Sequence, residues 1–96
     1  MPIYVSGSGR LKAEKDPDAI LDYTLDLTDW LAGDSLDSLT VTVQNLTLIR
    51  SEIVGDKAVA WVSGGTVGTQ GEVQFRFATI AGRQDDRTLY VKIKEK

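Results

Sequence analysis

The stretch from Glu72 to Lys94, EVQFRFATIAGRQDDRTLYVKIK, decides the fold. Its first half alternates apolar and other residues at a period of two, and its second half does the same after the turn-forming Ala81-Gly82-Arg83. That period places the apolar side chains on one face of a β-strand. The inward-facing residues are then Val73, Phe75, Phe77, Thr79, Leu89, Val91 and Ile93. The stretch therefore predicts a long hairpin with one face on a core.

Shorter stretches with strand patterns precede this hairpin at residues 23–27, 39–44, 46–54 and 57–62. A single helical turn is expected at residues 28–33, because Thr28 is a good N-cap residue and Gly33 a good helix terminator. Turns recur at intervals of roughly eight to twelve residues, a spacing typical of β-sandwiches. We predict an all-β, immunoglobulin-like antiparallel β-sandwich of six to seven strands. A small barrel is the alternative.

The start of the chain has a different character. Residues 1–18 contain Ser6-Gly7-Ser8-Gly9 and the turn-former Asp16-Pro17-Asp18, with few large apolar residues. We predict an extended N-terminal arm over 1–18, weakly held by the core and open to ordering by a neighbouring subunit, and a sandwich domain over 19–96. Ile3 and Val5 could form a short edge strand within this arm.

Composition excludes several kinds of chemistry. The 96 residues include no cysteine and no histidine. A zinc site of cysteines and histidines, a cysteine nucleophile, a Ser-His-Asp triad and imidazole acid–base catalysis are all excluded. No enzyme activity, metal or cofactor is expected. No apolar stretch is long enough to span a membrane, so neither a membrane nor an export route is expected.

Charge is distributed unevenly along the chain. The net charge is minus 3, which argues against nucleic acid as a partner. Residues 14–37 hold eight acids and one base, a balance of minus 7, whereas the rest of the chain has a balance of plus 4. This separation predicts a molecule with an acidic and a basic part, suited to head-to-tail contacts between copies or with a partner. A solvated surface without a partner is an equally valid interpretation of charge alone.

Several apparent sites are better explained as structure. The acids between Asp16 and Asp29 do not follow the spacing of a calcium loop, and the glycines of 64–71 match no phosphate-binding motif. Asp85 and Asp86 are adjacent, so their side chains diverge instead of forming a catalytic pair. Trp30 and Trp61 are expected in the core, although an exposed tryptophan could stack on a sugar.

Three stretches in this order resemble one family: DPDAILDYTLD at 16–26, followed by WL at 30–31 and GD at 33–34; VAWVSGGTVGT at 59–69; and TIAGRQDDR at 79–87. Together they extend from Asp16 to Arg87 and are similar to small virion proteins of tailed bacteriophages, of the fiber-tail adaptor or head-tail structural type. The resemblance implies a non-enzymatic virion component with an immunoglobulin-like fold, assembled in the cytoplasm of a host bacterium.

We therefore predict an adaptor in the tail or the head-tail and fiber attachment region, acting through contacts with tail, fiber or capsid proteins and through self-association. The alternatives are a capsid decoration (cement) protein and an immunoglobulin-like carbohydrate-binding module. The expected partner-binding residues are basic ones in the last third, set against acids near the arm. They are Arg76, Arg83 and Arg87, and Asp16, Asp18 and Asp22. Charge reversal at Arg83 and Arg87 is expected to weaken assembly without unfolding the domain.

Overall fold

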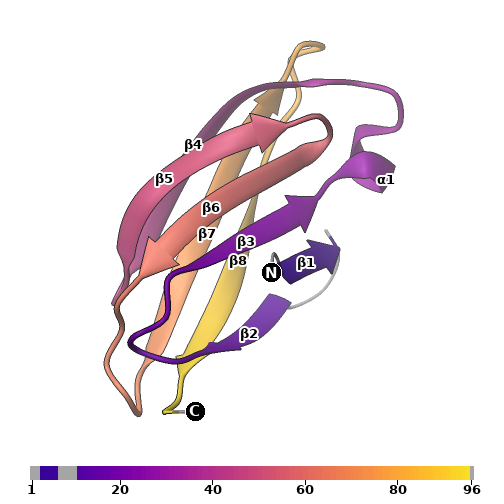
Figure 1. Ribbon diagram of the computed structural model, residues 1–96. Coiled ribbons are helices and arrows are strands. Elements are labelled where there is room, and N and C mark those ends of the chain that lie inside the picture. The colour runs from indigo at the N-terminus through magenta and orange to yellow at the C-terminus, as the bar shows by residue number, and fades with distance from the viewer. Residues whose placement is uncertain (1–2, 7–10, 96) are drawn as a thin grey trace.

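In the computed structural model, which describes residues 3–6 and 11–95, the chain forms two stacked four-stranded sheets (Figure 1). The first sheet has the strand order β1-β3-β6-β5 and the second β2-β8-β7-β4. The elements are β1 (Ile3–Ser6), β2 (Leu11–Lys15), β3 (Leu21–Asp26), α1 (Thr28–Leu31), β4 (Leu36–Gln44), β5 (Thr47–Val54), β6 (Lys57–Ser63), β7 (Gln70–Thr79) and β8 (Gln84–Ile93). The predicted all-β sandwich is confirmed, and the described strands do not close into one barrel. The immunoglobulin-like topology stays a prediction.

The long hairpin lies where the sequence pattern predicts it. β7 and β8 are antiparallel, with Val73 opposite Leu89 and Phe75 opposite Arg87, and β4 pairs with the other edge of β7. The even-numbered residues of β7 face outward and its odd-numbered residues are buried. The period of two therefore fixes both the strands and the face that covers the core.

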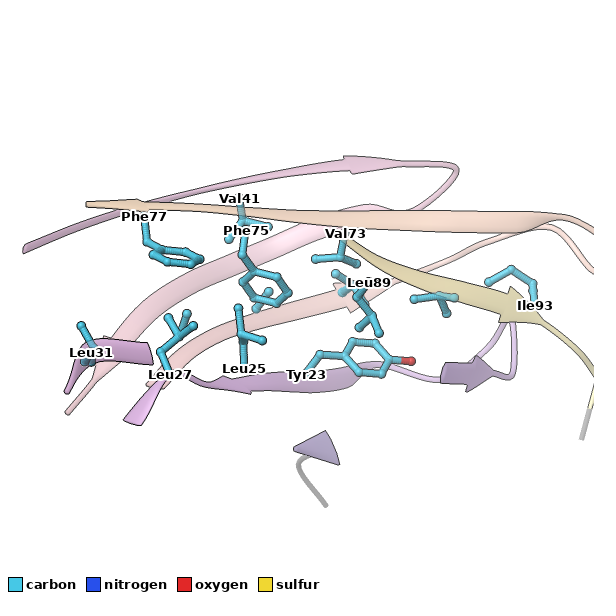
Figure 2. Packing of buried hydrophobic residues seen from close by; sticks show 14 residues of the cluster. Tyr23, Leu25, Leu27, Leu31, Val41, Val73, Phe75, Phe77, Leu89 and Ile93 are labelled. Atoms are coloured by element: carbon cyan, nitrogen blue, oxygen red, sulfur yellow. The ribbon is translucent and has the colours of Figure 1, made fainter. Parts of the chain in front are cut away.

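The core lies between the two sheets (Figure 2). Tyr23, Leu25 and Leu27 come from one side and Val73, Phe75 and Phe77 from the other, and all six side chains are buried. Burial of each large apolar side chain contributes about 1.5–3 kcal/mol, so this layer is the main source of stability. Both faces of β6 are also largely covered, as its run of apolar residues predicts.

The predicted helical turn is present as α1, but Thr28 does not cap it. Thr28 is the first helical residue instead of the N-cap, and no side chain caps the helix at Leu27. The Asp26 carboxylate accepts hydrogen bonds from the Thr28 backbone N–H (3.0 Å) and hydroxyl (2.6 Å). These bonds hold the pKa of Asp26 below its usual value. Asp26 therefore fixes the passage from β3 into α1.

The described part of the N-terminal segment contributes one edge strand to each sheet. β1 pairs in parallel with β3, and β2 pairs in parallel with β8, so the segment adds a strand to each sheet. The sandwich consequently has eight strands, and two of its strand pairs are parallel. Residues 1–2 and 7–10 of the expected arm lie outside the described residues. The domain boundary at 18/19 stays a prediction.

Tyr23 carries a polar atom into the core. Its side chain is fully buried, and its hydroxyl oxygen has no hydrogen-bond partner among the described residues. Burial raises the pKa of Tyr23 to about 12, because removal from water disfavours the charged phenolate more than the neutral phenol. The hydroxyl therefore lowers the stability of the fold without compensation from a hydrogen bond.

Tyr23→Phe is expected to raise the free energy of unfolding by about 1 kcal/mol at neutral pH, since it removes an unpaired buried polar group. Above pH 10 the unfolded chain releases the Tyr23 proton and the folded chain does not, so wild-type stability falls as pH rises toward 12. The variant lacks this contribution. Urea unfolding of both proteins at pH 7 and pH 11 tests this. A less stable variant at pH 7 would contradict it.

Candidate functional site

Arg83 lies at the centre of a contact between the β7–β8 hairpin and α1. Its guanidinium donates to the backbone carbonyls of Leu31 (2.7 Å) and Trp30 (3.1 Å) and to the carboxylate of Asp34 (3.2 Å). It also lies over the Trp30 ring, 4.3 Å from the ring centroid. Trp30 in turn packs edge-on against Phe77 of the core. Arg83 thus joins the C-terminal end of α1 to the hairpin.

Asp34 is the second charged group of this contact. Its pKa is held below the usual value by hydrogen bonds from the Thr79 hydroxyl, the Ser35 backbone N–H and the Arg83 side chain. The backbone N–H of Ala81 also approaches Asp34, at 3.4 Å. As pH falls and the carboxylate is protonated, the contribution of this contact to stability is lost. Sequence reasoning missed Asp34 as the partner of Arg83.

The other two predicted basic residues lie nearby on the same hairpin. Arg76 faces outward and approaches Asp86 at 3.9 Å, with 72% of its side chain exposed. Arg87 donates to the Asp85 carboxylate at 2.6 Å and is mostly buried. This bond is the first cause of the lowered pKa of Asp85. Of the three predicted bases, Arg76 has the most exposed side chain.

A shallow, open hollow lies beside Arg76. It has a volume of about 460 Å³ and is lined by Arg76, Gln84, Asp85 and Asp86. Its lining carries both signs of charge, and its open shape suits a polar segment of a protein partner more than an enclosed small molecule.

The predicted acidic residues lie at the opposite end of the sandwich. Asp16 and Asp18 are in the connection from β2 to β3, where the Asp16 carboxylate accepts the backbone N–H of Asp18 at 2.8 Å. Asp22 lies on β3 opposite Trp61 of β6. In Figure 1 this connection is at the lower end of the molecule and the β7–β8 hairpin is at the top. The structure therefore places the three predicted acids and the three predicted bases at opposite ends of the sandwich.

Lys15 connects two loops at the end that carries the predicted acids. Its side chain is fully buried, and its ammonium donates to the carbonyls of Asp16 (2.8 Å) and Gly64 (2.7 Å). Desolvation lowers the pKa of Lys15, and the charges of Asp16 and Asp18 partly oppose this. The bond to Gly64 joins the β2–β3 connection to the β6–β7 loop, so the two loops form one surface.

The charge separation along the sequence is only partly kept in space. Lys94 lies 3.6 Å from Glu14, and Arg83 pairs with Asp34, so bases of the last third neutralise acids of the first third within one molecule. The expectation of an acidic and a basic part thus needs correction: each end of the sandwich carries both signs. What remains at each end is an exposed apolar residue beside charges, Ile20 and Val67 at one end and Ile80 at the other.

The tryptophans are engaged within the molecule. Trp30 is half-buried under Arg83 and against Phe77, and Trp61 is half-buried with Arg50 over its ring at 4.7 Å. Both rings therefore have an arginine stacked on one face, which a sugar would have to displace. The carbohydrate-binding alternative gains no support from them.

Among the described residues, no three acids converge closely enough to hold a metal ion. Within the same ranges, no helix has the length and apolar character needed to cross a bilayer.

The fold and these surfaces define a class: a small β-sandwich domain whose candidate residues lie on exposed, charged surfaces at its two ends. A model of one protein family, described as podophage GP4 fiber-tail adaptor protein gp77, matches residues 15–92. The chain belongs to this family of phage tail adaptors. The resemblance found in the sequence motifs is thereby confirmed.

Two solved structures align with most of the chain. The cysteine protease inhibitor EhICP2 from Entamoeba histolytica aligns with a TM-score of 0.59 at 10% identity, covering 97% of this chain and 95% of that one. The solution structure of amebosin aligns with a TM-score of 0.47 at 16% identity, over 96% and 97% of the two chains. At such identity the first likeness shows a shared fold alone. A search of curated proteins found no similar sequence.

Proposed function

We propose that this protein is a non-enzymatic structural adaptor of a phage tail, which joins two virion proteins by binding one at each end of the sandwich. Its place is then in the virion, assembled in the host cytoplasm. The observation that carries the proposal is the separation of the two residue groups by the length of an elongated molecule, whose longest dimension is 41 Å. An adaptor must hold two partners without overlap, and two ends of one rigid sandwich achieve this.

The first end consists of the β2–β3 connection with Asp16 and Asp18, the start of β3 with Asp22, and the exposed apolar Ile20 and Val67. The second end consists of the β7–β8 hairpin with Arg76, Arg83, Arg87 and the exposed Ile80. Interfaces combine a few apolar anchors with a charged rim that selects the partner. Each end has both components.

Within the second end the three arginines have different roles. Arg83 is held by four groups of its own chain, so its reversal would disturb the fold as well as any interface. Arg76 has one weak ion pair and an exposed side chain, and it borders the hollow. Arg76 is therefore the appropriate residue for a test of binding.

Arg76→Glu is expected to weaken binding of the partner at the hairpin end at least severalfold, because it reverses an exposed charge in the contact surface. Asp18→Lys is expected to do the same at the other end. Stability of both variants is expected to stay within about 0.5 kcal/mol of wild type, since the changed groups are exposed. Binding of the purified variants to the tail and the fiber protein of the same phage, measured by interferometry, tests this.

The decisive result is a crossed pattern, in which each variant loses one partner and keeps the other. Thr42→Lys, on the exposed face of β4 away from both ends, is the control and is expected to keep both partners. Loss of neither partner, or equal loss of both in each variant, would contradict binding at two ends.

A further inference from the structure

The strand β5 forms one edge of the first sheet, and β1 forms the other. β5 is the last strand in that sheet, and among the described strands it is hydrogen-bonded to β6 alone. Most of its eight residues are exposed, including Ile49 at 51% and Val54 at 52%. An exposed edge of this length with apolar side chains is a template for pairing with another strand.

The order of side chains along β5 is symmetric about Ser51. Arg50 and Glu52 flank it, and Ile49 and Ile53 lie one position further out. When two copies of such a strand are placed antiparallel across a two-fold axis at Ser51, Arg50 of each copy lies opposite Glu52 of the other. Opposite charges in facing positions stabilise antiparallel pairs.

The faces of the sheet also agree with this arrangement. Arg50 lies opposite Trp61 of β6, and Glu52 lies opposite Val59, so both charged side chains are on the same face of the first sheet. Directly opposed residues in an antiparallel pair share a face, as Arg50 and Glu52 would across the axis. Ile49 is the extra residue of a bulge between Leu48 and Arg50 and has no partner on β6, so the regular part of β5 runs from Arg50 to Val54.

The edge strand β4 of the second sheet does not have this property. Its exposed positions are held by the polar residues Asp37, Ser38, Thr40, Thr42 and Gln44. It has one charged residue within its bounds and no apolar side chain exposed to the extent of Ile49. Charge complementarity therefore selects β5.

We infer that β5 is a self-association surface, through which two copies of this chain pair antiparallel about Ser51 and join their first sheets into one continuous sheet. This names a surface for the self-association that the sequence analysis predicts. The contact is isologous, so it closes at two copies and leaves both ends of each sandwich free for other proteins. Because five residues a side form a small interface, the dimer is weak and forms at high protein concentration.

Sedimentation velocity and native mass spectrometry of the purified protein over a wide concentration range test the inference. Wild type is expected to show a monomer–dimer equilibrium. In Arg50→Glu, positions 50 and 52 both carry carboxylates, so two pairs of carboxylates face each other across the axis. In Glu52→Arg, two pairs of guanidinium groups face each other in the same way. Each change is expected to raise the dimer dissociation constant at least about tenfold, since two facing pairs become repulsive.

The double variant Arg50→Glu with Glu52→Arg restores opposite charges across the axis and is expected to dimerise again. An equimolar mixture of the two single variants is expected to form heterodimers preferentially. Circular dichroism checks that each variant is folded, because Arg50→Glu also removes the contact with Trp61. Thr42→Glu on β4 is the control for the other edge and is expected to dimerise like wild type.

A wild-type protein that stays monomeric at all concentrations would overturn the inference. So would single variants that dimerise as well as wild type, or a double variant and a mixture that show no recovery. The measurement uses this protein alone, so its outcome does not depend on whether a tail or fiber protein binds the two ends.

Discussion

Arg83→Ala is expected to lower the free energy of unfolding by about 3 kcal/mol, because three hydrogen bonds of a charged group and a contact with an aromatic ring are lost together. Two of the acceptors are the backbone carbonyls of Trp30 and Leu31, the last residues of α1. In the variant these carbonyls lose their hydrogen-bond donor. With only four residues, α1 cannot form without such tertiary support. Urea unfolding followed by circular dichroism measures the effect.

Arg76→Ala provides the matched control. Both arginines belong to the β7–β8 hairpin region, but Arg76 has an exposed side chain and one ion pair at 3.9 Å. Its loss is expected to change stability by less than about 0.5 kcal/mol. Arg83→Lys keeps the charge and loses the planar fork, so it is expected to recover less than half of the deficit. Equal effects of Arg83→Ala and Arg76→Ala would refute the role of Arg83 in holding α1.

Gly65→Ala is expected to lower the free energy of unfolding by about 2–4 kcal/mol, from an unfavourable backbone conformation and overpacking. Gly65 has a φ of +106°, and a Cβ there would lie 2.6 Å from Cδ1 and 2.9 Å from Cγ1 of Ile93. Ile93 is buried in the core at the end of β8 and cannot move into solvent. Thermal unfolding of the variant measures the loss.

Gly68 allows the two causes to be separated. It lies in the same loop with a φ of +85°, but a Cβ there would meet no atom within 4 Å. Gly68→Ala is therefore expected to cost only about 1 kcal/mol, the backbone part of the effect. If the two variants were equally stable, contact with Ile93 would not be the reason for a glycine at position 65.

The strands of the core were predictable because their period of two is a local property. β7 alternates over its ten residues and β8 from Leu89 to Ile93, so one face of these stretches is apolar whatever the strands pair with. The family was predictable from the ordered motifs between Asp16 and Arg87. In the same way, the symmetry of residues 49–53 is visible in the sequence, but it acquires meaning only once β5 is known to be an edge.

The contacts that shape the two ends were not predictable, because their partners are distant in the chain. Arg83 binds carbonyls 52 and 53 residues away, and Lys15 binds one that is 49 residues away. A backbone carbonyl is present at every residue and leaves no signal in the sequence. For this reason the sequence did not reveal the intramolecular role of Arg83, and its role at an interface stays a prediction. The parallel pairing of β2 with β8 was missed for the same reason.

The pairing of β2 with β8 has a consequence for how the protein acquires its fold. Residues 11–15 are synthesised well before their partners at residues 89–93. The second sheet therefore cannot be completed until residue 93 has been made, and β2 has no partner on β8 until then. Pairings between strands so far apart in sequence raise the contact order, and topologies with high contact order fold slowly.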